Sequence, residues 1–210
     1  MQSVTLLAVS KTFGIDAIAE AHAAGQRCFG ENYVQEAVEK VAALSGLVPR
    51  PEWHLIGPIQ TNKTRVVAAT FDWVHSIDRI KVAERLSAQR PVGLAPLSVC
   101  VQVNVSGEAS KSGLPPAEVS AVAHAVAALP GLRLRGLMAI PAADGDIAAQ
   151  RRPFRALRTL FDQLRDEGLA VDTLSAGMSD DLEAAILEGA TMVRIGSAIF
   201  GRRTSGPRPG

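Results

Sequence analysis

The chain has 210 residues, of which 47% are hydrophobic and 20% are charged, and its formal net charge is +1. This composition excludes an intrinsically disordered chain. The balance of 22 basic against 21 acidic residues argues against a protein that binds nucleic acid through a basic surface. At this length we expect one domain, which buries about 70% of the surface of the unfolded chain.

The number of cysteines and the residues at the N-terminus indicate in which cellular compartment the protein is expected. Cys28 and Cys100 are too few and too far apart for a disulfide framework or a zinc site, and we expect both to be small buried thiols. The chain does not open with the charged and apolar segments of a signal peptide. No window approaches the roughly 18 apolar residues of a membrane span. We therefore expect a cytoplasmic protein with no membrane contact and no bound metal.

Short apolar runs rich in β-branched residues alternate along the whole chain with longer segments of helical period. The spacing of Phe154, Leu157, Phe161 and Leu164, for example, gives one of the predicted helices a single apolar face. Eight runs have strand character, and each is followed by such a helical segment: 4–9, 27–29, 53–56, 73–75, 97–104, 132–139, 173–175 and 192–195.

This alternation predicts an α/β fold. Eight βα units form either a (β/α)8 TIM barrel or a doubly wound open sheet, because parallel strands need crossovers that cover both faces. The number of units favours the TIM barrel. We expect a single barrel domain over residues 1–201, with no helix before the first strand. Residues 202–210 are rich in Arg, Gly and Pro and are predicted to be a disordered tail.

Lys11 stands directly after the first predicted strand. In TIM barrels the groups that bind and react lie at the C-terminal ends of strands and in the loops that follow. A lysine in apolar surroundings there has a larger neutral fraction, and its neutral amine attacks aldehydes. Lys11 is therefore the candidate for a Schiff base, and the alternative is a solvated lysine that merely ends a strand.

The loops after the seventh and eighth predicted strands each contain a glycine and a serine, Gly177 with Ser179 and Gly196 with Ser197. These two loops form the recurrent phosphate site of TIM barrels. Glycine lets the backbone approach a phosphate closely, and the serine hydroxyl adds a donor. Each pair alone is more typical of a turn. Together, and opposite Lys11, they indicate a phosphorylated aldehyde, of which pyridoxal phosphate is the obvious example.

Over residues 6–201 the chain resembles the pyridoxal phosphate homeostasis proteins, which are single-barrel relatives of the N-terminal domain of alanine racemase, a fold-type III barrel. Members of that family usually carry a helix before the first strand, which this sequence lacks. The resemblance depends on seven segments that follow one another in the family's order: 8–12, 29–36, 54–63, 103–113, 136–140, 177–181 and 194–201.

The resemblance implies roles for individual residues. Lys11 carries pyridoxal phosphate as a Schiff base, and Ser179, Gly196 and Ser197 hold the phosphate. Arg194 faces the pyridine nitrogen. A guanidinium there disfavours a proton on the ring nitrogen and so weakens the stabilisation of a carbanion. The alternative for Arg194 is a salt bridge at the mouth of the barrel.

Three further residues complete the predicted cofactor site. Asn32 lies beside the cofactor by the same resemblance, although taken alone it is typical of a helix N-cap. His54 lies in an apolar strand, where a histidine is typically a core residue that braces a pocket. Met178 fits packing around the cofactor.

The sequence favours a carrier over an enzyme. Racemisation needs two acid–base groups, one on each face of the substrate, and in the racemase, as the resemblance implies, the second is a tyrosine from another, β-rich domain. Here the only tyrosine is Tyr33, and 210 residues leave no room for such a domain. We expect a monomeric protein that binds pyridoxal phosphate, hands it to apo-enzymes, and acts in vitamin B6 and amino-acid homeostasis.

Two alternatives remain open. The first is a pyridoxal-phosphate-dependent enzyme such as a weak amino-acid racemase. The second is a Schiff-base aldolase barrel that binds phosphosugars without a cofactor, although such enzymes commonly place their lysine on a later strand than Lys11.

Overall fold

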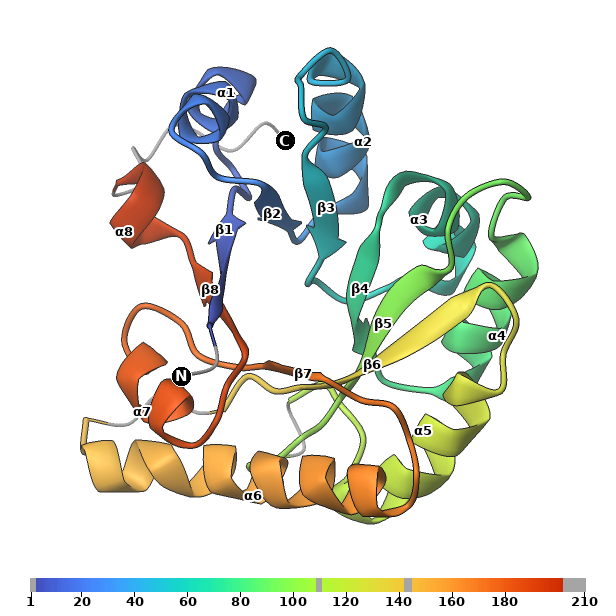
Figure 1. Ribbon diagram of the computed structural model, residues 1–210, viewed down its shortest axis with the longest axis vertical. Coiled ribbons are helices and arrows are strands. Elements are labelled where there is room, and N and C mark those ends of the chain that lie inside the picture. The colour runs from blue at the N-terminus through green and yellow to red at the C-terminus, as the bar shows by residue number, and fades with distance from the viewer. Residues whose placement is uncertain (1–2, 109–110, 142–144, 202–210) are drawn as a thin grey trace.

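The computed structural model describes residues 3–108, 111–141 and 145–201. Eight parallel strands follow one another around a closed barrel in sequence order, and β1 pairs with β8 to close it (Figure 1). The predicted TIM barrel is confirmed, whereas the predicted tail over 202–210 lies outside the described residues. The strands are β1 (Thr5–Val9), β2 (Cys28–Glu31), β3 (Glu52–Leu55), β4 (Trp73–Ile77), β5 (Leu97–Gln102), β6 (Leu132–Met138), β7 (Thr173–Ser175) and β8 (Met192–Ile195).

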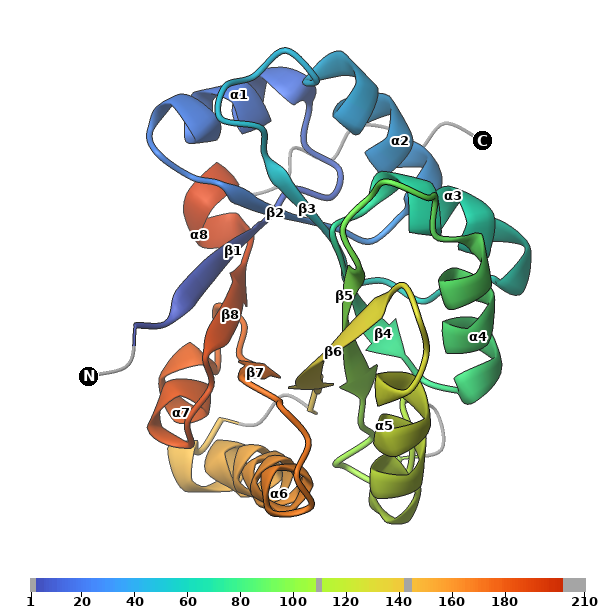
Figure 2. The same ribbon diagram turned by 45° about the vertical axis from the view of Figure 1, so that its right-hand side comes forward.

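Helices surround the strands, and each strand is followed by a helix on the outside of the barrel (Figure 2). Two short 3₁₀ helices, η1 (Thr61–Lys63) and η2 (Pro116–Glu118), lead into α3 and α5. The helices are α1 (Ile15–Ala23), α2 (Val34–Ala43), α3 (Thr64–Thr70), α4 (Ile80–Gln89), α5 (Val119–Ala127), α6 (Ile147–Asp166), α7 (Leu182–Leu187) and α8 (Ser197–Phe200).

Some strand ends differ from those predicted, and backbone pairing explains the differences. β2 continues to Glu31 because it stays paired with β3 as far as Leu55. β5 ends at Gln102, whose carbonyl accepts the Leu114 N–H at 2.8 Å instead of a donor from a neighbouring strand. The ends of periodic segments depend on such long-range pairing, which a local pattern does not contain.

Side chains alternate between two environments along each strand. Trp53 and Leu55 of β3 point outward into the main hydrophobic core against the helices, and both are almost fully buried. Between them, His54 points into the barrel interior, where its ring contacts His75 of β4. The interior therefore has successive levels of side chains between the N-terminal and C-terminal ends of the strands.

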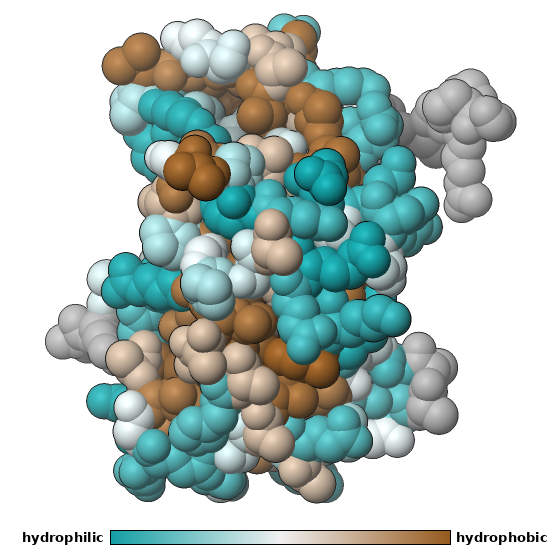
Figure 3. Space-filling model, turned by 90° about the vertical axis from the view of Figure 1, so that its right-hand side faces the viewer, coloured by the Kyte–Doolittle hydropathy of each residue, from teal (hydrophilic) through white to brown (hydrophobic). Residues whose placement is uncertain are grey.

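The outer surface beside α3, α4 and α5 mixes hydrophilic and hydrophobic residues (Figure 3). Exposed apolar side chains in this part of the chain include Val66 of α3 and Val92 and Leu94, which follow α4. None of the helices in the described ranges combines the length and the apolar character needed to cross a membrane.

Candidate functional site

A pocket of about 360 Å³ opens at the C-terminal ends of the strands. It contains every predicted cofactor residue except His54. Its lining comprises Val9, Lys11, Phe13, Asn32, Ile56, Ile140, Met178, Ser179, Asp180, Arg194, Gly196, Ser197 and Gly201.

Lys11 is held between two anchored neighbours. On one side, Ser10 donates its backbone N–H to the Gly30 carbonyl at 2.9 Å and its hydroxyl to Glu31 Oε1 at 2.6 Å. On the other, Thr12 has a positive φ of 68° and donates its N–H to Glu36 Oε1 at 2.6 Å. Because the flanking backbone is fixed on both sides, the Lys11 side chain starts from a defined position at the pocket.

A buried ion pair between Lys40 and Glu31 holds the turn that carries Lys11. Lys40 of α2 donates its ammonium to the Ser10 carbonyl and to Glu31 Oε1, both at 2.7 Å, and Lys40 is only 5% exposed. Burial raises the pKa of Glu31, although the donors on Lys40 and Ser10 oppose that rise. The sequence analysis did not identify Lys40 and Glu31 as residues that support the site. A lysine in a predicted amphipathic helix is normally expected to be exposed, and only the structure shows that Lys40 is buried.

Arg194 projects from β8 into the floor of the pocket. Its Nη1 donates to the carbonyl and to the hydroxyl of Ser175 at 2.6 and 2.8 Å, and its Nη2 donates to the Ala139 carbonyl at 2.9 Å. Burial lowers the pKa of Arg194 to about 10, so the guanidinium keeps its charge at neutral pH. A guanidinium has five N–H donors, and these bonds leave donors over for a ligand in the pocket.

The loops after β7 and β8 contribute a second part of the pocket lining. Gly177 has a positive φ of 96°, and a Cβ there would lie 2.7 Å from the Ala185 Cβ. Asp181 Oδ1 accepts the Met178 N–H at 2.6 Å and closes the turn that presents Ser179. These contacts make glycine necessary at position 177 and fix where the serine hydroxyl emerges.

Gly196 and Ser197 form the start of α8. Gly196 is the residue before the helix, and Ser197 is its first residue. The first N–H groups of a helix have no partner inside that helix. The Phe200 ring stacks on Phe13 with 4.9 Å between the ring centroids, which attaches α8 to the loop that carries Lys11.

The side-chain oxygen of Asn32 is buried at this pocket and has no hydrogen-bond partner. An unpaired buried acceptor costs about 1–3 kcal/mol, and a ligand with a donor would satisfy it. A primary amine, hydroxyl donors, a cation and an unpaired acceptor around one cavity fit a phosphorylated aldehyde with a polar ring, as pyridoxal phosphate is.

His54, which we predicted from the sequence as a cofactor residue, lies outside the pocket lining. The residues of β3 that point inward are Glu52, His54 and then Ile56 beyond its end, and Ile56 is the one that reaches the pocket. His54 is fully buried, and its ring stacks on Trp73 with 5.3 Å between centroids. Sequence position alone does not show how deep in the barrel an inward-pointing residue lies.

His54 belongs to a hydrogen-bonded row through the barrel interior, which we call the interior row: Arg194, Ser175, His75, His54 and Glu52. His75 Nδ1 lies 2.8 Å from Ser175 Oγ, and His75 Nε2 lies 2.9 Å from His54 Nδ1. His54 Nε2 lies 2.9 Å from Glu52 Oε1. The interior row thus connects the pocket with the N-terminal end of the barrel.

The groups at the two ends of the interior row, Glu52 and Arg194, determine which atom carries each proton between them. Glu52 is ionised, since the hydrogen bond from His54 lowers the pKa of its carboxyl, and a carboxylate only accepts. His54 Nε2 therefore donates, and its Nδ1 accepts from His75 Nε2. His75 Nδ1 then accepts the hydroxyl of Ser175, whose oxygen accepts from Arg194. Burial lowers the pKa of both histidines, which keeps them neutral.

Comparison with known proteins decides the family. The model of the alanine racemase N-terminal domain matches residues 1–204. The pyridoxal phosphate homeostasis protein of Pseudomonas aeruginosa is 62% identical over 204 residues, which cover 97% of this chain and 86% of that protein. The chain belongs to the family of pyridoxal phosphate homeostasis proteins.

Other members of the pyridoxal phosphate homeostasis family are similar over the same range. The Escherichia coli K12 protein is 56% identical over 203 residues, covering 96% of this chain and 87% of its own length. The structure of PipY from Synechococcus elongatus with pyridoxal phosphate bound has a TM-score of 0.87 and 40% identity, covering 96% of this chain and 94% of PipY. The resemblance found in the sequence is thereby confirmed.

Proposed function

We propose that this protein is a cytoplasmic, monomeric carrier that holds pyridoxal phosphate as a Schiff base on Lys11 and releases it to apo-enzymes. In this way it takes part in vitamin B6 and amino-acid homeostasis. The observation that carries the proposal is the pocket itself, in which Lys11 faces the serine-bearing loops that follow β7 and β8.

Each part of the pocket has a task in this proposal. When bound, pyridoxal phosphate supplies an aldehyde that condenses with a primary amine. Lys11 would supply that amine and so hold the cofactor covalently, with water as the group released. Ser179, Ser197 and the backbone at Gly196 hold the phosphate, and Met178 packs against the ring.

Arg194 is the group that steers the protein away from carbanion chemistry. Held by Ser175 and Ala139 in the floor of the pocket, its guanidinium brings a fixed positive charge to the ring. A positive charge there disfavours protonation of the pyridine nitrogen, and the unprotonated ring is a weak electron sink. The buried acceptor of Asn32 adds a contact that orients the ring.

The titratable groups around the pocket also support a carrier. In the described part of the chain, the titratable side chains that line it are Lys11, Asp180 and Arg194. Tyr33 is 59% exposed and lies outside the lining, as does His54. A racemase needs a second acid–base group opposite the lysine, and neither residue is placed to act as one.

An absorption spectrum tests the proposal. Wild-type protein incubated with pyridoxal phosphate and then freed of unbound cofactor by gel filtration is expected to stay yellow, and Lys11→Ala treated in the same way is expected to be colourless. Lys81→Ala, in α4, is the matched lysine control and should behave as wild type. A colourless wild type, or a yellow Lys11→Ala, would contradict the Schiff base.

A second measurement separates carrier from enzyme. The yellow protein is incubated with single L-amino acids and the optical rotation is followed. We expect no change faster than that produced by free pyridoxal phosphate, whereas faster racemisation would replace the carrier with an enzyme.

A further inference from the structure

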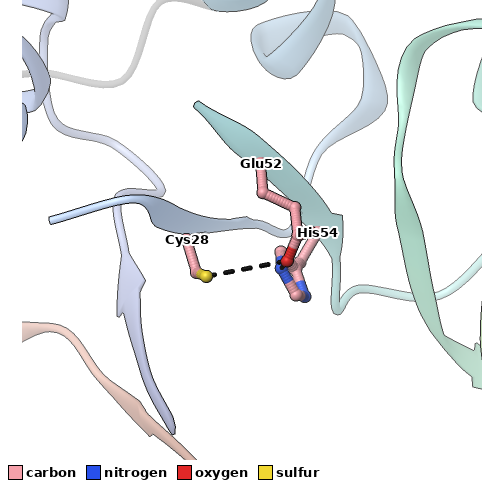
Figure 4. A group of neighbouring side chains, drawn as sticks. All are labelled: Cys28, Glu52 and His54. Carbon is pink, nitrogen blue, oxygen red and sulfur yellow. Dashed lines mark hydrogen bonds and ion pairs between the residues drawn. The ribbon is translucent and has the colours of Figure 1, made fainter. Parts of the chain in front are cut away.

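Three side chains converge at the N-terminal end of the barrel, on the side opposite the pocket. Cys28 of β2 and Glu52 and His54 of β3 point toward one place (Figure 4). Cys28 Sγ lies 3.6 Å from Glu52 Oε1, and His54 Nε2 lies 2.9 Å from the same oxygen. All three potential ligand atoms lie within 4.8 Å of one another. The pairing of Cys28 with Glu52 across adjacent strands creates this group, which no spacing along the sequence indicates.

We propose that Cys28, Glu52 and His54 form a binding site for a Zn²⁺ ion, with a fourth coordination position open to solvent. One sulfur, one imidazole nitrogen and one carboxylate oxygen are the donor types that zinc takes, and sets of three protein ligands with an open position are common. A hard ion such as Mg²⁺ prefers oxygen alone, so the sulfur ligand favours zinc.

The distances suit a tetrahedral ion. With zinc bonds of about 2.3 Å to sulfur and about 2.0–2.1 Å to nitrogen and oxygen, tetrahedral ligands lie about 3.6 Å apart for sulfur and oxygen. The same bonds place nitrogen and oxygen about 3.3 Å apart. The first separation equals that between Cys28 and Glu52, and the second asks His54 and Glu52 to part by a few tenths of an ångström from 2.9 Å.

The surroundings provide room for the ion and a balanced charge. A cavity of about 350 Å³, lined by Cys28 and Glu52, supplies space for a water ligand. Without an ion, the Cys28 thiol donates to Glu52 Oε1. With a divalent cation in its place, the proton is lost and the ion neutralises both the thiolate and the carboxylate. The one cationic side chain lining this cavity in the described residues, Arg135, is paired with Asp172 at 2.8 and 2.9 Å.

The interior row holds the histidine ligand in place. A metal-binding histidine usually has its second ring nitrogen hydrogen-bonded, which fixes the orientation of the ring. His54 Nδ1 has that partner in His75 Nε2 at 2.9 Å, and Trp73 stacks on the His54 ring. The ring orientation of His54 is therefore already set, and only the small separation from Glu52 has to change when an ion binds.

Metal binding reverses the hydrogen bonds of the interior row. His54 Nε2 binds the ion only without its proton, so the ring proton is on Nδ1 and donates to His75 Nε2. His75 then carries its own proton on Nδ1 and donates to Ser175 Oγ. Each histidine keeps one proton, Glu52 stays anionic, and the Cys28 proton is released to solvent.

Cobalt is the probe for the site, because its absorption reports both tetrahedral geometry and a thiolate ligand. The full-length, tag-free protein is loaded with Co²⁺ and freed of excess ion by gel filtration. We expect one bound equivalent with a thiolate band in wild type and in Cys100→Ala, the control at the other cysteine, and no such band in Cys28→Ser. A persisting band in Cys28→Ser, or no retained Co²⁺ in wild type, would overturn the site.

Nitrogen NMR on wild-type protein with labelled histidines tests the proposal without a variant. The chain has four histidines, and His22, whose Nε2 lies 2.8 Å from the Pro49 carbonyl, is an internal reference. On addition of Zn²⁺, we expect His75 to change from a proton on Nε2 to one on Nδ1 while His22 is unchanged. Signals of His54 and His75 that stay in place with Zn²⁺ bound would mean adventitious binding elsewhere and would refute the proposal.

Discussion

The two ends of the barrel are built from the same strands but present their polar groups differently. At the C-terminal end, Lys11 and Ser179 lie in loops, held by contacts such as the Thr12 bond to Glu36. At the N-terminal end, Cys28 and Glu52 lie on the strands themselves. Strand pairing fixes the side chains on the strands directly, whereas the side chains in the loops depend on hydrogen bonds from other elements.

The interior row joins these two ends. It begins at Arg194 in the floor of the pocket and finishes at Glu52 beside the N-terminal cavity. Each histidine in it has both ring nitrogens hydrogen-bonded, so the proton positions of the two rings depend on each other. The barrel interior is thus a polar connection as well as a packed core.

The largest loss of stability is expected from replacing His75, the residue in the middle of the interior row. His75→Leu removes the acceptor of the Ser175 hydroxyl and the donor to His54 Nδ1, and leaving each of these buried groups unpaired costs about 1–3 kcal/mol. Denaturant unfolding in the presence of a chelator measures the loss. His124→Ala, at a histidine that is largely exposed, is the control and should unfold close to wild type. Equal stability of the two variants would mean that the interior row is not a unit.

The next effect concerns the C-terminal end alone. Gly177→Ala forces a side chain into a backbone with positive φ, at about 1–2 kcal/mol, and adds a close contact with Ala185, at about 1–3 kcal/mol more. Gly25→Ala is the matched control, because Gly25 also has a positive φ of 105° but nothing lies within 4 Å of its Cβ. Unfolding midpoints should rank wild type, Gly25→Ala, Gly177→Ala, and only Gly177→Ala should bind pyridoxal phosphate more weakly. If both variants lost the same stability, the close contact between residue 177 and Ala185 would be excluded.

The smallest effect concerns Cys100, a fully buried thiol on β5 between the two ends of the barrel. Burial raises the pKa of Cys100 from 9.0 to about 12, so above pH 9 the unfolded chain loses a proton that the folded chain keeps. The raised folded-state pKa means that stability is complete below pH 9 and falls as the pH rises toward 12, with a slope approaching about 1.4 kcal/mol per pH unit. Unfolding of wild type and Cys100→Ala under reducing conditions measures this slope. The variant should lose less stability over the same range, and parallel curves would contradict the predicted burial of the thiol.

The sequence was sufficient for the parts of the fold that repeat locally. Alternating strand and helix patterns predict the barrel, and the position of Lys11 after an apolar strand predicts that it faces the C-terminal end. Ser179 and Ser197 could be placed by the same rule, since loops after known strands emerge at a known end.

The sequence did not show how deep in the barrel each inward-pointing side chain lies, or which residues of different elements are in contact. His54 and Ile56 both point inward from the region of β3, and only the closed barrel shows that Ile56 reaches the pocket. Lys40 is buried because the Ser10 carbonyl, at the end of another strand, and Glu31, at the end of β2, both accept its ammonium protons. The signal for the interior row was the pair of histidines in neighbouring apolar strands, His54 and His75, whose rings are hydrogen-bonded in the interior.

The most direct test of the central claim locates the cofactor chemically. Protein incubated with pyridoxal phosphate is reduced with borohydride, which converts a Schiff base into a stable secondary amine, and is then digested and mapped by mass spectrometry. The account predicts that the phosphopyridoxyl group is on Lys11. A group attached mainly to another lysine, or no attachment in the native protein, would contradict it.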